Sequence, residues 1–424
     1  MAVVTVSGSP VVGTKYTVTT ASSADWASVS NSTYFFDLTD KLVHYKDSTG
    51  AIIELFGAAG LSYFTEAQAT AAPNATVNVD SLTAVASTTD ADFAIIPKGA
   101  GAILASIPNS IATVPNVGGN KRGQYALDLQ HYGQINAGTE VASGNYAAIV
   151  CGSRNTASGA SSTVVNGLRN TASANDSFIA SGYLNSASGL YSFVGAGQSN
   201  NATSTYATVI NGYANNATSS YTFTGGFGCI ASGTRSFSYG EYCYATGGYS
   251  FAIGNNNLAA SDSSVAMGVY ANSFNVIGRF VFGTSGSNYT TGTSQASKLV
   301  LTNLSTSATP IELAVQNTVS DARYNLTLQD NQAMRVKGSI IGKQSASLNV
   351  AAFDFDYVIV RGVGVGTTSV VVSNVNVVTN IPAWGTPTIT ADTARGYASI
   401  KVIGATTTNI RWSATVESVE IIYA

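Results

Sequence analysis

Two carboxylates two residues apart are the strongest candidates for chemistry in this chain: Asp354 and Asp356, within Phe353-Asp-Phe-Asp-Tyr357. Glycoside hydrolysis uses a pair of carboxyl groups about 5–9.5 Å apart, which act as acid and as base or nucleophile. On a β-strand, side chains two residues apart point to one face with about 7 Å between them. The distance fits, but the alternating Phe and Tyr residues are typical of an edge strand with one apolar face. We therefore interpret both aspartates as structural and predict no enzymatic activity.

Histidine and basic residues give weaker signals. The two histidines, His44 and His131, have no nearby G-x-S-x-G nucleophile motif, so a serine-type triad is not indicated. Two distant histidines and scattered carboxylates also lack the spacing of metal ligands, and we expect neither a metal nor a cofactor. Lys121 and Arg122 follow Gly119 and could form an anion-binding turn, but two cations on a glycine turn are a weak signal for phosphate.

The composition excludes several classes of protein. Charged residues make up 10% of the 424 residues and the formal net charge is -3, so the chain lacks the basic surface with which proteins bind nucleic acid. No apolar run approaches the roughly 18 residues that span a bilayer, and we expect no membrane insertion. The first ten residues lack the charged and apolar regions of a signal peptide, so we expect synthesis in the cytoplasm without export.

A short internal repeat occupies the middle of the chain. One glycine recurs every 15 residues and later every 14 residues, which defines nine coils, at Gly152, Gly167, Gly182, Gly197, Gly212, Gly226, Gly240, Gly254 and Gly268. Three positions before each glycine the residue is always apolar, namely Ile149, Val164, Ile179, Val194, Val209, Phe223, Phe237, Phe251 and Val265. Five positions after the glycine, alanine recurs in every coil but the ninth, where Ser273 takes its place.

A coil this short predicts a parallel β-solenoid. Such a length accommodates two short strands of about four or five residues and two tight turns, but not a pair of helices. Stacked strands lie about 4.8 Å apart, so nine coils predict a rod on the order of 40 Å long. In this rod, the apolar residues before each glycine should face the alanines across a thin interior. The glycine is expected at a turn that requires positive φ or close backbone approach.

An asparagine column stands three positions after the glycine. Its members are Asn155, Asn170, Asn185, Asn200 and Asn215, and Cys229 and Cys243 take the same position in the next two coils. Identical amides at the strand spacing can hydrogen-bond along the stack, so we favour a structural ladder over an exposed ligand-binding row. The two cysteines would be close enough for a disulfide, and a reduced pair that fills a small interior space is the alternative that we favour.

Aromatic residues are expected on the outer faces of the coils, because each coil offers only about two inward positions. The residues concerned are Tyr146, Phe178, Tyr191, Phe193, Tyr206, Tyr221 and Tyr249. Aromatic area of this kind requires a partner, and three rolls packed about a common axis would cover it. We therefore expect a homotrimer in which most tyrosines serve packing rather than sugar binding.

The repeat resembles a known family. The segments Ser250-Phe-Ala-Ile-Gly254 and Ser264-Val-Ala-Met-Gly268, with Ala-Ser-Gly at 157–159, 187–189 and 231–233, are similar to the head repeats of YadA-type trimeric autotransporter adhesins. Those repeats form a left-handed parallel β-roll in a homotrimer. The resemblance covers residues 144–273, roughly a third of the chain, and implies the same left-handed roll.

The flanking segments resemble a different group of proteins. They show no heptad stalk and no membrane-barrel anchor of the kind that the bacterial adhesins carry. Residues 90–101, 119–130 and 410–420 instead resemble bacteriophage fibre or spike proteins built on the same roll. This resemblance implies a homotrimer on the virion exterior, as a tail or head fibre, held by other virion proteins through its N-terminal region. Its C-terminal region would contact a host-surface glycan or protein. A polysaccharide-depolymerising spike and a bacterial surface adhesin are the alternatives.

Strand patterns and composition divide the chain into five segments. They are an N-terminal β-hairpin module with probable docking to the virion at 1–72, a connector at 73–143, the β-roll at 144–273, a β-rich neck at 274–337 and an antiparallel β-sandwich at 338–424. The sandwich would cap the open end of the rod. Arg361 and Trp384 in it are candidate receptor contacts, because loops at a fibre tip are exposed. The predicted fold class is all-β throughout.

Overall fold

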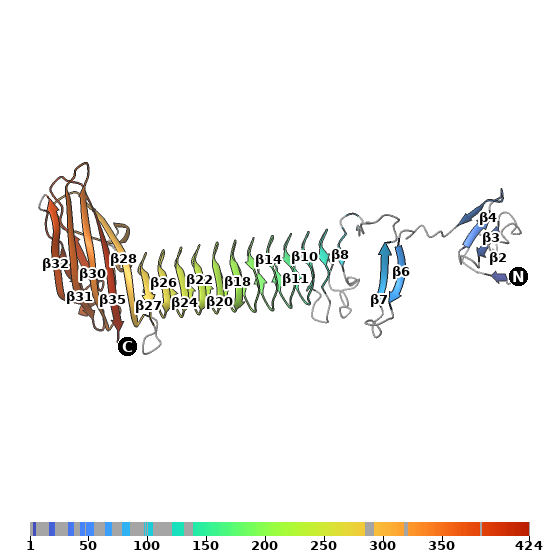
Figure 1. The fold of residues 1–424 in the computed structure, drawn as a ribbon, viewed down its shortest axis with the longest axis horizontal. Coiled ribbons are helices and arrows are strands. Elements are labelled where there is room, and N and C mark those ends of the chain that lie inside the picture. Colours follow the sequence, from blue (N-terminus) through green and yellow to red (C-terminus); the bar gives the residue numbers. More distant parts are fainter. Residues whose placement is uncertain are drawn as a thin grey trace. The chain divides into compact units, whose positions relative to one another are not determined.

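A computed structural model describes residues 3–5, 17–21, 33–37, 43–46, 48–54, 64–69, 79–84, 97, 99, 101–104, 121–130, 139–284, 292–317, 321–381 and 384–423. His131 and Gly119 lie outside these ranges. The chain comprises two compact units, Met1–Ile96 and Pro97–Ala424. The described elements are β-strands and three single-turn helices, which confirms the all-β prediction (Figure 1). Within these ranges, no helix has the length and apolar character required to cross a membrane.

The first unit contains a five-stranded sheet and a separate hairpin. The sheet consists of β1 (Val3–Thr5), β2 (Thr17–Ala21), β3 (Thr33–Asp37), β4 (Val43–Lys46) and β5 (Ile52–Glu54), in that order. The antiparallel pairing of β4 with β5 is the hairpin that the sequence predicted. β6 (Phe64–Ala69) pairs with β7 (Val79–Ala84), and this hairpin crosses the expected boundary at residue 72.

The second unit begins with a parallel β-solenoid of about nine coils, as predicted. Its first wall is formed by β10 (Ala148–Ile149), β12 (Thr163–Val164), β14 (Phe178–Ile179), β16 (Phe193–Val194), β18 (Thr208–Tyr213), β20 (Phe223–Phe227), β22 (Phe237–Glu241), β24 (Phe251–Asn255) and β26 (Val265–Val269). Its second wall is formed by β11 (Thr156–Ala157), β13 (Thr171–Ala172), β15 (Ser186–Ala187), β17 (Asn201–Ala202), β19 (Asn216–Ala217), β21 (Ile230–Ala231), β23 (Tyr244–Ala245) and β25 (Leu258–Ala259). Each strand pairs with its equivalent one coil away (Figure 1).

The first wall extends beyond the expected range of 144–273 at both ends. Before it, β8 (Ile103–Leu104) and β9 (Leu127–Asp128) pair in parallel with each other and with β10. After it, β27 (Phe280–Gly283) pairs in parallel with β26. Sequence analysis missed these strands because the glycine and alanine positions that define the repeat are not maintained there.

The interior of the 14-residue coils differs from the expected one. In the 15-residue coils the apolar residue three positions before the glycine is buried, as expected. In the later coils the buried residue stands only two positions before the glycine, at Thr224, Ser238, Ala252 and Ala266. The prediction that Phe223, Phe237, Phe251 and Val265 face the interior is therefore wrong, because these residues are only partly buried.

The reason is where the shorter coils lose their residue. The pairing of β18 with β20 shifts register between Val209 and Gly212, so the missing position lies between the strand and the glycine. Val209 consequently pairs with Thr224, and Phe223 pairs with Thr208 on the outer face. Since side chains alternate along a strand, this one-residue difference moves each aromatic residue from the interior to the surface.

The anchoring glycines occupy turns where no other residue fits. Gly182 has φ of 113°, and a Cβ atom built on it would lie 2.1 Å from the carbonyl oxygen of Gly197 in the next coil. The same close approach recurs at the other anchors of the roll. Backbone stacking at the strand spacing thus excludes a side chain at this position.

The C-terminal part of the second unit is a sandwich of two antiparallel sheets. The larger sheet continues from β27 in the order β28 (Ser294–Ser305), β35 (Ile410–Ile422), β30 (Gln332–Gln344), β31 (Val350–Arg361) and β32 (Ser369–Ile381). The smaller sheet has the order β29 (Ile311–Glu312), β34 (Tyr397–Val402) and β33 (Thr388–Asp392). β28 comes from the segment expected to form a neck.

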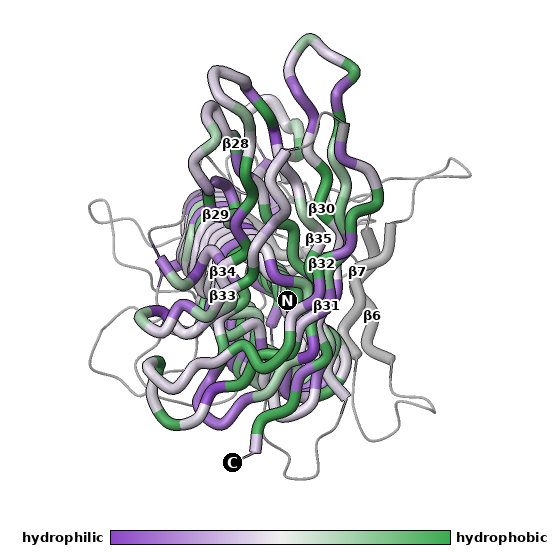
Figure 2. The backbone as a smooth tube through the Cα atoms, turned by 90° about the vertical axis from the view of Figure 1, so that its left-hand side faces the viewer, coloured by the Kyte–Doolittle hydropathy of each residue, from purple (hydrophilic) through white to green (hydrophobic). Residues whose placement is uncertain are grey.

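One apolar core lies between the two sheets. Leu299, Val336 and Phe353 of the larger sheet and Ile389 and Ile400 of the smaller sheet belong to the same cluster of buried residues. Apolar and polar residues alternate along the long strands (Figure 2). The larger sheet therefore has one face on this core and an outer face in contact with solvent.

Candidate functional site

The asparagine column is buried inside the roll. In a typical coil, the side-chain amide of Asn185 donates to the carbonyl oxygens of Ser181 (3.1 Å) and Gly197 (2.9 Å). Its Oδ1 accepts a hydrogen bond from the backbone N–H of Asn200 at 3.0 Å. The amides thus complete the hydrogen bonds of the turns, and buried groups of this kind present no ligand-binding row to solvent.

The cysteines interrupt this column. Cys229 and Cys243 are buried and free, and the backbone N–H of Cys243 lies 3.5 Å from the sulfur of Cys229. The hydrogen bond from the Cys243 thiol lowers the pKa of Cys229, whereas the same contact and burial raise the pKa of Cys243. Asn257, which sequence analysis did not assign to the column, resumes it and donates to the carbonyl of Gly268 at 2.7 Å.

The outer side of the first wall carries stacked aromatic rings. We call the column Phe178, Phe193, Phe223, Phe237, Phe251 and Phe280 the aromatic face. Ring centroids are 5.5 Å apart for Phe178 and Phe193, 5.0 Å for Phe223 and Phe237, and 4.6 Å for Phe237 and Phe251. These rings lie partly in solvent in the isolated chain, and they form a continuous apolar stripe along the roll.

A second aromatic column follows the adjacent turns. Tyr191, Tyr206 and Tyr221 stack with centroids 5.0 Å apart. The guanidinium of Arg235 then lies between the rings of Tyr221 and Tyr249, 5.2 Å and 5.3 Å from their centroids. These rings are exposed at their edges, while their faces contact one another.

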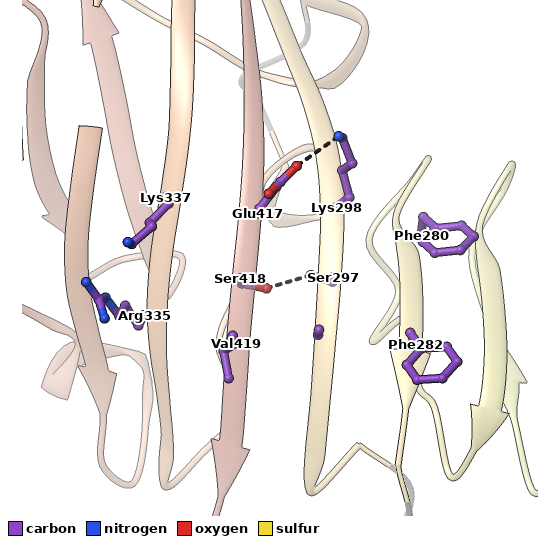
Figure 3. A pocket seen from close by; sticks show the side chains of 10 residues that line it. Phe280, Phe282, Ser297, Lys298, Arg335, Lys337, Glu417, Ser418 and Val419 are labelled. Atoms are coloured by element: carbon purple, nitrogen blue, oxygen red, sulfur yellow. Dashed lines mark hydrogen bonds and ion pairs between the residues drawn. The ribbon is translucent and has the colours of Figure 1, made fainter. Parts of the chain in front are cut away.

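A groove lies where the roll meets the larger sheet of the sandwich (Figure 3). This junction groove has a volume of about 450 Å³ and is lined on one side by Phe280 and Phe282. Lys298 and Glu417 form an ion pair of 2.8 Å across it. Arg335 on β30 is likewise paired, with Asp356 on β31 at 2.8 Å. The charges of the junction groove are thus balanced within the chain.

A second groove lies on the outer face of the same sheet, at the other end of its strands. This cationic groove has a volume of about 550 Å³ and is lined by Lys343, Arg411, Leu304, Ile341, Gln344 and Asn409, among others. It opens to solvent beside the hairpin that joins β30 to β31. Its basic residues were not singled out in the sequence, because they lie 68 residues apart and only the pairing of β30 with β35 brings them together.

The two aspartates considered for hydrolysis lie on the outer face of β31. The hydrogen bond and charge of Arg335 hold the pKa of Asp356 below its usual value. Asp354 accepts a hydrogen bond from Ser339 at 2.6 Å. β31 lies between β30 and β32, so the expectation of an edge strand is wrong. An ionised, ion-paired Asp356 is unsuited to donate a proton.

Other singled-out residues have structural partners. Trp384 is buried, with its ring 5.5 Å from that of Trp412, and Arg361 pairs with Asp330 at 2.7 Å. Their expected exposure as receptor contacts is therefore wrong. Arg122 forms a buried ion pair with Asp128 at 2.7 Å, which leaves its guanidinium unsuited to an exposed anion turn. His44 is buried within β4.

Comparison with known proteins gives structural neighbours of one kind. No protein-family model and no curated protein matches the chain. Solved neighbours include the tailspike protein of Acinetobacter phage vB_ApiP_P1, with 9% identity and a TM-score of 0.25 over 70% of this chain and 53% of that one. The tailspike of Acinetobacter baumannii bacteriophage Fri1, a capsular polysaccharide depolymerase, shares 13% identity, with a TM-score of 0.22 over 70% and 55% of the two chains. The chain thus spans about half the length of these tailspike proteins.

Proposed function

We propose that this chain is a structural fibre or spike protein of a bacteriophage, located on the virion exterior, that attaches the particle to the host cell surface. The observation that carries this proposal is the aromatic face. It runs along the roll to Phe280, next to the sandwich, and its rings require a partner surface of the same length. Further copies of the same roll, stacked at the same spacing, supply such a surface.

We propose that three chains pack side by side through their aromatic faces. The narrow interior of each roll, filled mainly by small residues such as Ala252 and Ala266, buries little apolar area for its length. Burial of the phenylalanines between chains would add the larger part of the missing stabilisation, since an aromatic side chain buries about 150–250 Å². The junction groove extends this face onto the sandwich, and its balanced charges suit a contact between subunits.

The two ends of the chain have different proposed roles. The N-terminal unit, with its five-stranded sheet, docks to other virion proteins, as the resemblance to phage fibres implies. The sandwich contacts the host surface, since it ends the roll and carries the open cationic groove. For the sandwich we propose binding rather than cleavage, because Asp356 is ion-paired with Arg335 and is held ionised.

The location and orientation of the fibre are tested by electron microscopy of gold-labelled source particles. An antibody against residues 338–424 should label the outside of the virion, at a distance from the capsid or tail surface. Label at the tail supports a role in host adsorption, and label around the capsid supports a head fibre. Label confined to uninfected cells would contradict the phage assignment and would favour the bacterial adhesin.

A further inference from the structure

We propose that the cationic groove binds a carboxylate-bearing sugar of a surface polysaccharide, an inference that rests on the proposed attachment function and names its ligand class. The central observation is a pair of like charges. Lys343 on β30 and Arg411 on β35 are direct partners in the antiparallel register, and both lie on the exposed outer face of the sheet. Like charges directly opposite each other destabilise a β-sheet. An arrangement that costs stability at an open groove indicates a ligand that supplies the opposite charge.

The two cations have no carboxylate partner within the chain. Among the described residues, neither Lys343 nor Arg411 forms an ion pair, and the ammonium of Lys343 donates instead to the carbonyl oxygens of Gln344 and Ser347. On the same face, Lys298 and Arg335 of the junction groove are paired with Glu417 and Asp356. The difference between the two grooves is local, because the chain as a whole has a net charge of -3.

The remaining lining of the groove suits a sugar ring better than a bare ion. Leu304 and Ile341 expose 45% and 54% of their surface beside the cations and provide an apolar wall for the C–H side of a pyranose. Gln344 and Asn409 place side-chain amides at the rim, where they can bond to hydroxyl groups. Arg411 can hold a carboxylate with two parallel hydrogen bonds, as guanidinium groups commonly do.

The rim of the groove is held in place by the two loops that form it. The backbone N–H of Ser345 donates to the carbonyl of Asn409 at 2.9 Å, which joins the β30–β31 hairpin to the loop before β35. Asn349 donates to the side chain of Gln344 at 2.8 Å and orients its amide. A preformed site of this kind loses little conformational entropy when a ligand binds.

The charge of the cationic groove disfavours a second copy of the chain as its occupant. Symmetry-related copies would each bring Lys343 and Arg411, and a contact between two such grooves would place four cations together. A carboxylated glycan satisfies the charge and uses the volume of about 550 Å³, which lies within the usual range of small-ligand pockets.

The test uses two ligands that differ only in charge. Tetragalacturonate and its fully methyl-esterified form are titrated against the full-length protein by isothermal calorimetry at low and high salt. We expect binding of tetragalacturonate that weakens as salt rises, and no binding of the ester. Absence of tetragalacturonate binding, or equal binding of the ester, would overturn the inference.

Variants assign the binding to the groove. Lys343→Gln and Arg411→Gln should each weaken tetragalacturonate binding at least tenfold, while the matched control Lys298→Gln in the junction groove leaves it unchanged. The thermal midpoints of the first two variants should be unchanged or raised, because each removes a repulsion. A lowered midpoint in both variants, or equal loss of binding in Lys298→Gln, would contradict a ligand site at this position.

Binding of the fluorescently labelled protein to host cells separates this inference from the proposed function. If the protein binds host cells but not tetragalacturonate, attachment stands and the carboxylate site is wrong. If it binds tetragalacturonate through Lys343 and Arg411 but not the host cells, the site stands and the attachment function is wrong.

Discussion

Arg279 and Glu420 form an ion pair in which neither side chain is exposed to solvent, although 141 residues separate them. Arg279 directly precedes β27, the last strand of the roll, and Glu420 lies near the end of β35 in the sandwich. Glu420 also accepts hydrogen bonds from Ser297 Oγ at 2.8 Å and from the amides of Gln295 at 2.9 Å and Gln332 at 3.1 Å. This buried cluster joins the roll to the sandwich.

Removal of the Glu420 carboxylate should destabilise the second unit severely. Glu420→Ala leaves the Arg279 guanidinium buried without a counter-charge, which typically costs about 3–5 kcal/mol. The matched control is Glu417→Ala, which breaks the exposed ion pair with Lys298 and should cost less than about 1 kcal/mol. Urea unfolding of the full chain measures both, and equal losses would show that the buried cluster has no special role.

The same cluster predicts how stability depends on pH. Burial opposes ionisation of Glu420, but the charge of Arg279 and the hydrogen bonds outweigh it and hold the pKa below its usual value. A carboxyl group with a lowered folded-state pKa contributes stability above its unfolded-state pKa, about 4.5, and loses it as the pH falls through the folded-state value. We therefore expect the thermal midpoint to fall below about pH 4.5 and the fall to be smaller in Glu420→Gln. A midpoint that falls with the same slope in both proteins contradicts this account.

Sequence periodicity predicted the roll because its signals recur at fixed positions. The glycine and alanine columns depend only on contacts between neighbouring coils, and these contacts repeat. The side chosen for Phe223 was wrong because the glycine served as reference, and the residue lost in the shorter coil lies between the strand and that glycine. Counting from the alanine of the preceding second wall would have aligned Phe223 with Thr208, and both with the outer face.

The candidate sites could not be predicted in the same way. Lys343 and Arg411, like Arg279 and Glu420, come together through antiparallel pairing between strands far apart in sequence. A single sequence contains the strands but not their order in the sheet, so the segment at 274–337 was interpreted as a neck although β28 belongs to the sandwich. Asn257 could have been recognised, since it stands three positions after an anchoring glycine.

The close approach at the anchoring glycines predicts a large effect of one methyl group. Gly182→Ala would place a Cβ atom 2.1 Å from the carbonyl oxygen of Gly197 on a backbone with φ of 113°. We expect a loss of at least about 2 kcal/mol, measured by urea unfolding. Gly366→Ala is the matched control, because a Cβ atom there has no neighbour within 4 Å. A similar loss in both variants would contradict the proposed role of the turn.

The cysteine pair predicts a stabilising substitution. Asn257 occupies the column in a 14-residue coil, so an asparagine is compatible with the shorter coils as well. The double variant Cys229→Asn and Cys243→Asn would replace sulfur acceptors by amides, and we expect a gain of about 1 kcal/mol for each restored hydrogen bond. The control replaces both cysteines by alanine and should be less stable than the natural protein. Thermal unfolding decides, and an asparagine variant no more stable than the alanine variant would refute the continuity of the column.

Charge on the aromatic face should disrupt the proposed trimer without unfolding the roll. Phe237 stacks between Phe223 and Phe251 on the outer side of the first wall, so Phe237→Asp removes no interior residue. It would bury a carboxylate in each contact between copies, which carries a large desolvation cost. By analytical ultracentrifugation the natural protein should sediment as three chains of 43.4 kDa, and the variant as one. Thr171→Asp, which adds the same charge to the second wall, should remain trimeric. A natural protein with the mass of one chain, or a Phe237→Asp variant that stays trimeric, would exclude the aromatic face as the contact between subunits.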